Sequence, residues 1–301
     1  MIPETLLGVL LAFGASLSIA AVGSFGSRPF MEFESNPSNA AYVTLIISSI
    51  VLGSAVLLTG QAGLLLKMPL TTLAVFASVG IIQNAVGRRL WFVAIRHIGA
   101  NQSNTLISTE VIYSVVFAVI LLGERVGIVL EVGTALVFVG ALLIEGRRSA
   151  GRRSGNAMLG YETSIAAAFL FGLTPILISY GLGPFPHFLP ALFVTFSSAT
   201  IFFSFTIRPK SVLAEVYKNV DRVFVPFIVI SFLTIASQFF IFNSLLYAPV
   251  VFYAPILSTY PLFTVLFTRI QVRHIEVFGA RTLLSALLVV VGAVLVSLAS
   301  V

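Results

Sequence analysis

The stretch from Asn84 to Arg125, NAVGRRLWFVAIRHIGANQSNTLISTEVIYSVVFAVILLGER, decides how this chain folds. Two apolar runs meet in it at Gly99, a pattern typical of two membrane helices joined by a tight turn. Arg88 lies eleven residues before Gly99, and Glu110 lies eleven residues after it. Because antiparallel helices share the same rise per residue, the stretch predicts that Arg88 and Glu110 lie at similar depth. The sequence thus predicts that an arginine and a glutamate lie near each other within one helical hairpin.

Charged side chains at membrane depth are costly, and they usually face a protein interior or a wet cavity. We therefore interpret Arg88 and Glu110 as parts of a functional site. Two structural interpretations stay open. One is an ion pair that only locks two helices together, and the other is a pair of arginines that reach the headgroup layer beside Trp91 as an interfacial anchor. On a helix Arg89 is turned about 100° from Arg88, so it is the better candidate for such a headgroup contact.

The composition is that of an integral membrane protein. Hydrophobic residues make up 58% of the 301 residues, charged residues only 9%, and the mean hydropathy is +1.07. Soluble domains are roughly a quarter charged. Apolar runs of roughly 20 residues predict an all-α membrane fold, whereas a barrel would show shorter alternating segments. The net charge of +6 lies in short connections, which predicts a lipid bilayer as partner and no nucleic acid.

The sequence offers little for catalysis. It has no cysteine and only three widely spaced histidines, so we expect no disulfide, no metal and no other cofactor. The apolar runs contain no clustered carboxylates and no nucleophile motif, so we do not expect an enzyme.

Ten apolar segments are predicted to cross the membrane, five on each side of a basic, Gly/Ser-rich segment at the middle of the chain. This divides the chain into a five-helix repeat over 1–146, a linker over 147–156 and a second five-helix repeat over 157–301. The predicted spans are Thr5–Ser24, Ala40–Leu58, Leu70–His97, Asn101–Leu122, Val126–Ile144, Leu159–Leu182, Phe188–Phe205, Phe224–Tyr247, Val250–Thr268 and Phe278–Leu298.

The two halves repeat at an offset of 150 residues, at which LISTEVIYSVVF (106–117) lies over ILSTYPLFTVLF (256–267). The same offset pairs Asn84 with Thr234, Arg88 with Gln238, and Glu110 with Tyr260. The polar face therefore recurs with its charges replaced by neutral groups. An odd number of spans per repeat makes the second copy enter the membrane the other way up. Inverted repeats with a site near the midplane are the recurring plan of secondary transporters.

The candidate residues have distinct predicted roles. Arg88 could bind a substrate carboxylate or phosphate with two parallel hydrogen bonds, which a lysine could not reproduce. Glu110 could neutralise Arg88 until substrate arrives, or it could carry a coupling proton. For the aromatic candidates, helix packing or an interfacial belt stays open as an alternative. The predicted substrate-binding residues are Arg88, Glu110, Gln238, Tyr260, Asn84, Trp91, Thr234 and Tyr253. Prolines expected to break or kink apolar spans are Pro175, Pro255 and Pro261.

The run over 99–146 resembles the end of an EamA-type repeat of the drug/metabolite transporter superfamily. The resemblance lies in a small-residue entry, an apolar span, a turn carrying Gly123 and Glu124, and a helix with the pattern G-x-x-L-x-x-x-G from Gly133. The run over 263–298 is similar, but His274 stands where Glu124 does. The resemblance implies a transporter that works by alternating access, and it implies that Glu124 marks the start of the fifth span.

The orientation in the membrane has two conflicting indications. Alternating the loops along ten spans places thirteen basic residues on one side and only Lys67 and Arg125 on the other, which predicts both termini outside the cytoplasm. The resemblance instead implies both termini inside. The thirteen are Arg28, Arg96, Arg147, Arg148, Arg152, Arg153, Arg208, Lys210, Lys218, Arg222, Arg269, Arg273 and Arg281.

The leading functional hypothesis is a secondary active transporter in the cell membrane, a monomer or homodimer, that exports a small polar or anionic metabolite such as an amino acid. One alternative is a proton-coupled exporter of hydrophobic cations in which Glu110 is the key group. Another is a membrane scaffold without a transport cycle, although a buried arginine and glutamate are a poor choice for stability alone.

Overall fold

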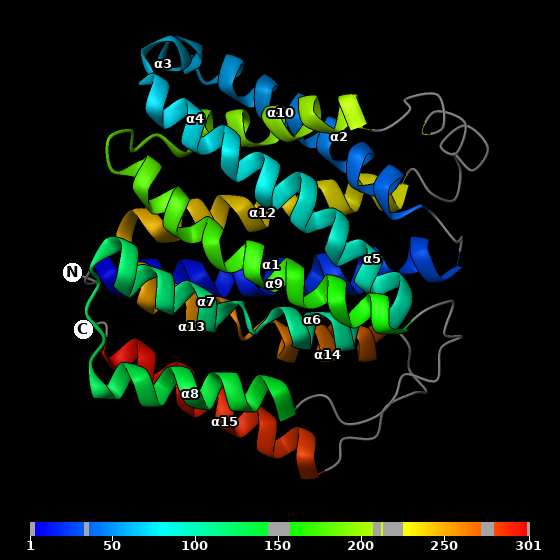
Figure 1. Cartoon of the computed structure of the whole chain (residues 1–301), viewed down its shortest axis with the longest axis vertical. Helices are drawn as coiled ribbons and strands as arrows, with labels where there is room; N and C mark the ends of the chain where they lie inside the picture. Colours follow the sequence, from blue (N-terminus) through cyan, green and yellow to red (C-terminus); the bar gives the residue numbers. More distant parts are fainter. Residues whose placement is uncertain are drawn as a thin grey trace.

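The computed structural model describes residues 4–32, 36–143, 157–206, 212, 225–271 and 280–299. Over these ranges the chain is helical and contains no β-strand (Figure 1). The predicted all-α membrane fold is therefore confirmed. Features of the sequence that lie outside the described residues are the linker 147–156, His274, Arg208, Lys210, Lys218, Arg222 and Arg273.

Eight helical segments among the described residues are long and apolar enough to cross a membrane. They are Glu4–Phe25, Pro37–Leu58, Leu70–Ile98, Gln102–Leu122, Ala157–Leu182, Phe188–Thr206, Val225–Tyr247 and Val250–Phe267. The predicted fifth span appears as a shorter apolar helix, Ile128–Leu143, and the predicted tenth as a shorter apolar stretch, Leu287–Ala299, within the helix Ala280–Ala299. Sixteen helical residues extend only about 24 Å, less than the roughly 30 Å of a bilayer core. Ten spans therefore stay a prediction.

Local sequence explains where the helices begin and end. Helix α1 covers Glu4–Glu32, and α2 (Pro37–Leu58) starts after Asn36, whose side chain accepts a hydrogen bond from the Ser38 N–H at 3.0 Å. The short helix α3 (Ala62–Lys67) leads to the third span. Gly99 has φ +84° and makes the predicted turn between the third and fourth spans, a conformation that side chains with a Cβ rarely adopt. That turn is confirmed.

The third span changes its helical winding halfway along. It consists of α4 (Leu70–Val79), the π-helical segment η1 (Gly80–Gly87) and α5 (Arg88–Ile98). The glycine at the start of η1 permits a close approach, because a Cβ on Gly80 would lie 2.0 Å from the Thr195 carbonyl oxygen. π-Helical segments often occur at functional sites, and this one ends directly before Arg88.

The fourth and ninth spans are each interrupted at matching positions. The fourth span consists of α6 (Ala100–Ile107), α7 (Glu110–Phe117) and the π-helical segment η2 (Ala118–Leu122). The ninth consists of α13 (Val250–Leu257) and α14 (Tyr260–Gln271). Both interruptions are Ser-Thr turns, 108–109 and 258–259, separated by the 150-residue offset. Pro175 and Pro255 lie inside helices as predicted, whereas Pro261 lies in the first turn of α14, where proline breaks nothing.

Six of the eight long spans pack as two groups of three. The remaining helices are α8 (Ile128–Leu143), α9 (Ala157–Leu182), α10 (Phe188–Thr206), α12 (Val225–Tyr247) and α15 (Ala280–Ala299). Helix α1 packs against α12, α13 and α14, while α9 packs against the third span and against α6 and α7. Helices α2 and α10 pair with each other, and α8 pairs with α15 at one edge of the molecule (Figure 1).

Candidate functional site

A cavity with a volume of about 50 Å³ lies between the two three-span groups. One side, which we call the charged wall, is formed by the third span, the fourth span and α9. The opposite side, the neutral wall, is formed by α1, α12 and the ninth span. The charged wall contributes Gln83, Arg88, Trp91, Ile107, Glu110, Phe171, Thr174, Pro175 and Ile178. The neutral wall contributes Ile19, Val22, Thr234, Ser237, Gln238, Ile241, Tyr253, Leu257 and Tyr260.

Arg88 reaches the cavity from the first turn of α5 and is only 5% exposed. Its Nη1 donates to Thr234 Oγ1 at 2.8 Å across the cavity, and its Nη2 donates to Asn84 Oδ1 at 2.5 Å one turn earlier. The guanidinium also lies 5.9 Å from the centre of the Phe196 ring. Arg88 does not reach a headgroup layer, so that interpretation is wrong for it. The neighbouring Arg89 is exposed, as its angular position predicts.

Glu110 begins α7 directly after the Ser-Thr turn and is also 5% exposed. A helix N-terminus favours a carboxylate in its first turn. Glu110 lies close enough to Tyr253 and Tyr260 to act on both phenols electrostatically. Among the described residues no ion pair joins Glu110 to Arg88, so the structural ion-pair interpretation is wrong. The reason is that Arg88 is held by Asn84 and Thr234 instead.

Four polar atoms around the cavity have no hydrogen-bond partner among the described residues. They are Arg88 Nε, Gln83 Oε1, Gln238 Oε1 and Tyr260 OH. Nearly all buried polar groups in proteins are hydrogen-bonded, so a cluster of exceptions needs an explanation. One donor, two acceptors and a hydroxyl that can do either would together be satisfied by a polar ligand.

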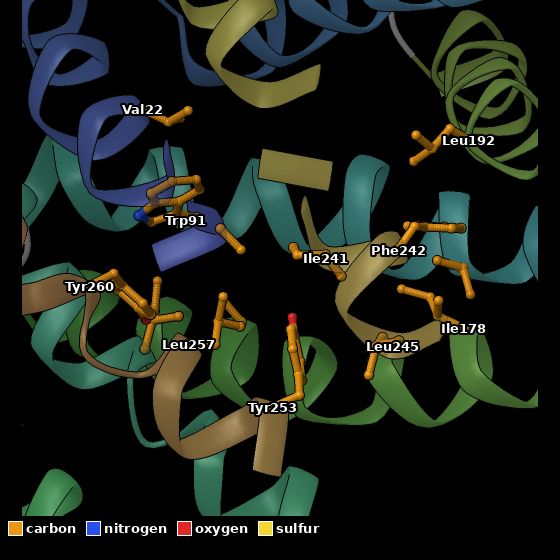
Figure 2. Close-up of a cluster of buried hydrophobic side chains, with 14 of the residues drawn as sticks. Val22, Trp91, Ile178, Leu192, Ile241, Phe242, Leu245, Tyr253, Leu257 and Tyr260 are labelled. Atoms are coloured by element: carbon orange, nitrogen blue, oxygen red, sulfur yellow. The ribbon is translucent and has the colours of Figure 1, made fainter. Parts of the chain in front are cut away.

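Seven of the eight predicted substrate-binding residues line this one cavity, and Asn84 is the exception. Asn84 is fully buried behind the wall and supports Arg88. Trp91 is buried and donates from Nε1 to Asn104 Oδ1 at 2.8 Å, so its interpretation as an interfacial anchor is wrong. Figure 2 shows Trp91 and Tyr260 on one side of the cluster, with the Tyr253 hydroxyl pointing toward Ile241.

Sequence periodicity missed Gln83 for a physical reason. In an α-helix, residues five apart are turned about 140° from each other, which would place Gln83 away from Arg88. In a π-helix the hydrogen bond joins residues five apart, so η1 brings Gln83 to the same side. Ser237 was missed although its signal is present, because Thr234, Ser237, Gln238 and Ile241 follow the i, i+3, i+4, i+7 pattern of one helix face.

Glu124 joins the end of the fourth span to the ninth. Its Oε1 accepts from the Val250 N–H at 3.0 Å, and its Oε2 accepts from the Val251 N–H at 2.9 Å. Both donors belong to the first turn of α13, whose free N–H groups and positive dipole end favour a carboxylate. Glu124 is thus a cap on a helix of the second half. Among the described residues no group of three or more His, Cys, Asp or Glu side chains could hold a metal ion.

Comparison with known proteins agrees with this architecture. Residues 6–146 match the model of the EamA-like transporter family. This family is part of the drug/metabolite transporter superfamily, and the match covers slightly less than half of the 301 residues. Its members are transporters rather than enzymes. The match suggests a membrane transporter of the drug/metabolite type, and eight helices among the described residues are long and apolar enough to span a membrane.

Two further comparisons bear on the fold and on curated relatives. A solved crystal structure, described only as that of a protein, is similar to this chain with a TM-score of 0.73. The two share 15% sequence identity over 97% of each chain, so this similarity concerns the fold alone. No curated protein matches the sequence.

Proposed function

We propose that this EamA-like protein is a secondary active transporter that exports a small polar or anionic metabolite, such as an amino acid, through the cavity between its two walls. The observation that carries the proposal is that a buried arginine and a buried glutamate face the same cavity without pairing with each other. Uncompensated charges at membrane depth are expensive, and such residues usually mark a substrate or ion pathway.

Arg88 is the proposed anchor for a substrate carboxylate. Asn84 and Thr234 each accept one hydrogen bond from its terminal nitrogens and fix the plane of the guanidinium. Its Nε–H has no partner among the described residues. A planar donor with a fixed orientation suits a carboxylate, which accepts two parallel hydrogen bonds.

Glu110 is the proposed partner of a substrate ammonium group or of a coupling proton. An amino acid carries both charges of a zwitterion, and this cavity offers an opposite charge for each. The apolar lining, including Ile19, Ile178 and Ile241, then provides a surface for the rest of the molecule. A cavity with mostly apolar walls and a few polar groups is the common form of a small-molecule site.

The proposed cycle rests on two inverted repeats, 1–146 and 157–301. Helices α1 and α9 run in opposite directions in Figure 1, as do α2 and α10, and α8 and α15. Each member of these pairs lies about 150 residues from the other. Each cavity wall combines spans from both halves, because α1 packs on α12 whereas α9 packs on the third span. Rocking of two such groups about a central site would give alternating access.

Transport by proteoliposomes tests the proposal. We expect Arg88→Ala and Arg88→Lys to reduce uptake of radiolabelled amino acids and organic acids by about 100-fold, since a hydrogen-bonded charge contributes about 1.5–3 kcal/mol. The matched control is Arg89→Ala, because Arg89 is exposed and should leave transport unchanged. Undiminished uptake by a correctly inserted Arg88→Ala protein would remove Arg88 from the site.

A second candidate function is export of hydrophobic cations. It is favoured by the aromatic surroundings of Glu110, since Tyr253 and Tyr260 lie near its carboxylate and Trp91 and Phe171 line the same cavity. Thermal stabilisation by a panel of ligands separates the two functions. Stabilisation by amino acids or organic anions supports the first function, and stabilisation by lipophilic cations alone supports the second.

A further inference from the structure

A chain of hydrogen bonds links the two walls of the cavity near Gly99. Trp91 Nε1 donates to Asn104 Oδ1 at 2.8 Å, and Asn104 Nδ2 donates to Thr264 Oγ1 at 2.9 Å. The Thr264 hydroxyl in turn donates to the Tyr260 carbonyl oxygen at 3.0 Å. An indole N–H can only donate, so Asn104 must present its oxygen to Trp91 and its amide nitrogen to Thr264.

This chain connects the two walls of the cavity. Trp91 and Asn104 belong to the charged wall, and Thr264 belongs to the neutral wall. Asn104 and Thr264 are completely buried. Helix α1 presses against the same point, because a Cβ on Gly23 would collide with Asn104 Nδ2. Any separation of the walls near Gly99 must therefore break the bond between Asn104 and Thr264.

Among the residues that the structure describes, the opposite end of the cavity has no equivalent bond. At the 150-residue offset, Asn104 corresponds to Ala254 and Thr264 corresponds to Ser114. Alanine has no polar side-chain atom, and Ser114 Oγ donates instead to the Gly172 carbonyl oxygen within the charged wall at 3.1 Å. That end carries a different contact, the bonds of Glu124 to the start of α13. The side-chain chain through Asn104 thus serves one end only.

We propose that Asn104 and Thr264 form a latch that holds the cavity closed at the Gly99 end, and that Asn104 also positions Trp91 as a cavity wall. The proposal rests on the alternating-access function above. Loss of the latch should favour the state that is open at the Gly99 end at the expense of the state open at the opposite end. If the bond had only a structural role, its loss would loosen both ends of the cavity together.

Cysteine labelling in this cysteine-free chain measures the two ends separately. Val22→Cys reports on the side of the cavity near Trp91, and Ile178→Cys reports on the opposite side (Figure 2). Each reporter is combined with Thr264→Val, which keeps the shape of the side chain and removes its hydroxyl. The labelling rate with a small methanethiosulfonate is measured on purified protein without substrate.

We expect Thr264→Val to raise the labelling rate of Val22→Cys by about two- to tenfold and to lower the labelling rate of Ile178→Cys. A change of this size is expected because the variant loses one buried hydrogen bond. Thr264→Ser, which retains the hydroxyl, should behave as the parent chain. Ser114→Ala, whose hydroxyl does not cross the cavity, should not shift labelling toward the Gly99 end. Asn104→Leu should shift labelling in the same direction as Thr264→Val.

Equal rates in Thr264→Val and parent, or faster labelling at both ends, would overturn the latch. These outcomes do not depend on substrate binding, because no substrate is present. Failure of the proposed function would appear separately, as unchanged transport by Arg88→Ala in proteoliposomes.

Discussion

The charged and neutral walls of the cavity share one interruption of a span and differ in the side chains that follow it. Both contain a span interrupted by a Ser-Thr turn, and both continue after the turn with a side chain that faces the cavity. In the charged wall that side chain is Glu110, and in the neutral wall it is Tyr260. Likewise, at the 150-residue offset, Arg88 of the charged wall corresponds to Gln238 of the neutral wall.

The difference indicates a division of labour. The two walls share an interrupted span, whereas the charged residues that line the cavity, Arg88 and Glu110, lie in one wall only. A ligand with two charges would then bind in one orientation, with its charged groups on the third and fourth spans. The neutral wall would contribute hydrogen bonds from Thr234, Gln238 and Tyr260. Separating this wall from the ligand when the cavity opens would cost less electrostatic energy than separating the charged wall from it.

Moving the arginine from position 88 in the charged wall to position 238 in the neutral wall gives the largest expected effect on transport. Arg88→Gln makes the charged wall resemble the neutral one and should reduce transport by about 100-fold. Adding Gln238→Arg should recover about tenfold of that loss. The reason is that Asn84 and Thr234, which hold Arg88, are themselves separated by the 150-residue offset, so Thr234 would lie one turn before the new arginine and Asn84 opposite it.

Initial rates in proteoliposomes measure this effect, and Gln238→Arg alone serves as the control. If the double variant folds and inserts but transports no better than Arg88→Gln, the two walls are not interchangeable at this position.

Glu110 and Tyr260 should differ by about an order of magnitude in their contribution to the transport rate. Glu110→Gln keeps the size of the side chain and removes its charge, and we expect transport to fall about 10- to 100-fold. Tyr260→Phe removes one neutral hydroxyl and should cost about two- to fivefold, in line with the smaller net contribution of neutral hydrogen bonds. Uptake rates measured at saturating and at low substrate concentrations provide the comparison. Similar losses for both variants would contradict the division of labour between the walls.

The smallest expected effect concerns stability. Gly172 lies in α9 where it meets α7, and a Cβ there would lie 2.5 Å from the Tyr113 Cβ and 3.0 Å from the Glu110 carbonyl oxygen. Gly172→Ala should therefore destabilise the protein by about 1–3 kcal/mol through overpacking. The corresponding residue of the neutral wall is Val22, which faces the cavity, so Val22→Ala should cost less than about 1 kcal/mol. Thermal unfolding in detergent measures both, and equal losses would refute the tighter packing of the charged wall.

Sequence reasoning reached many of the residues that line the cavity, because charge in an apolar chain is conspicuous. Arg88 and Glu110 stood out from their surroundings, and the 150-residue offset led from them to Gln238, Tyr260 and Thr234. The same reasoning failed where local winding departed from the α-helix, as at Gln83. It also overlooked Asn104, because a single asparagine in an apolar span does not reveal which two side chains it joins.

The sequence by itself determined the membrane character, the helical fold, the approximate bounds of eight spans and the residues that carry charge. These follow from composition and periodicity, since a bilayer requires long apolar helices and tolerates few ionised groups. Only the tertiary structure decided that Arg88 bonds to Thr234 rather than to Glu110, that Glu124 caps α13, and that Asn104 links the two walls. Each of these contacts joins residues whose distance in the chain has no bearing on their distance in space, because helix packing sets which side chains meet.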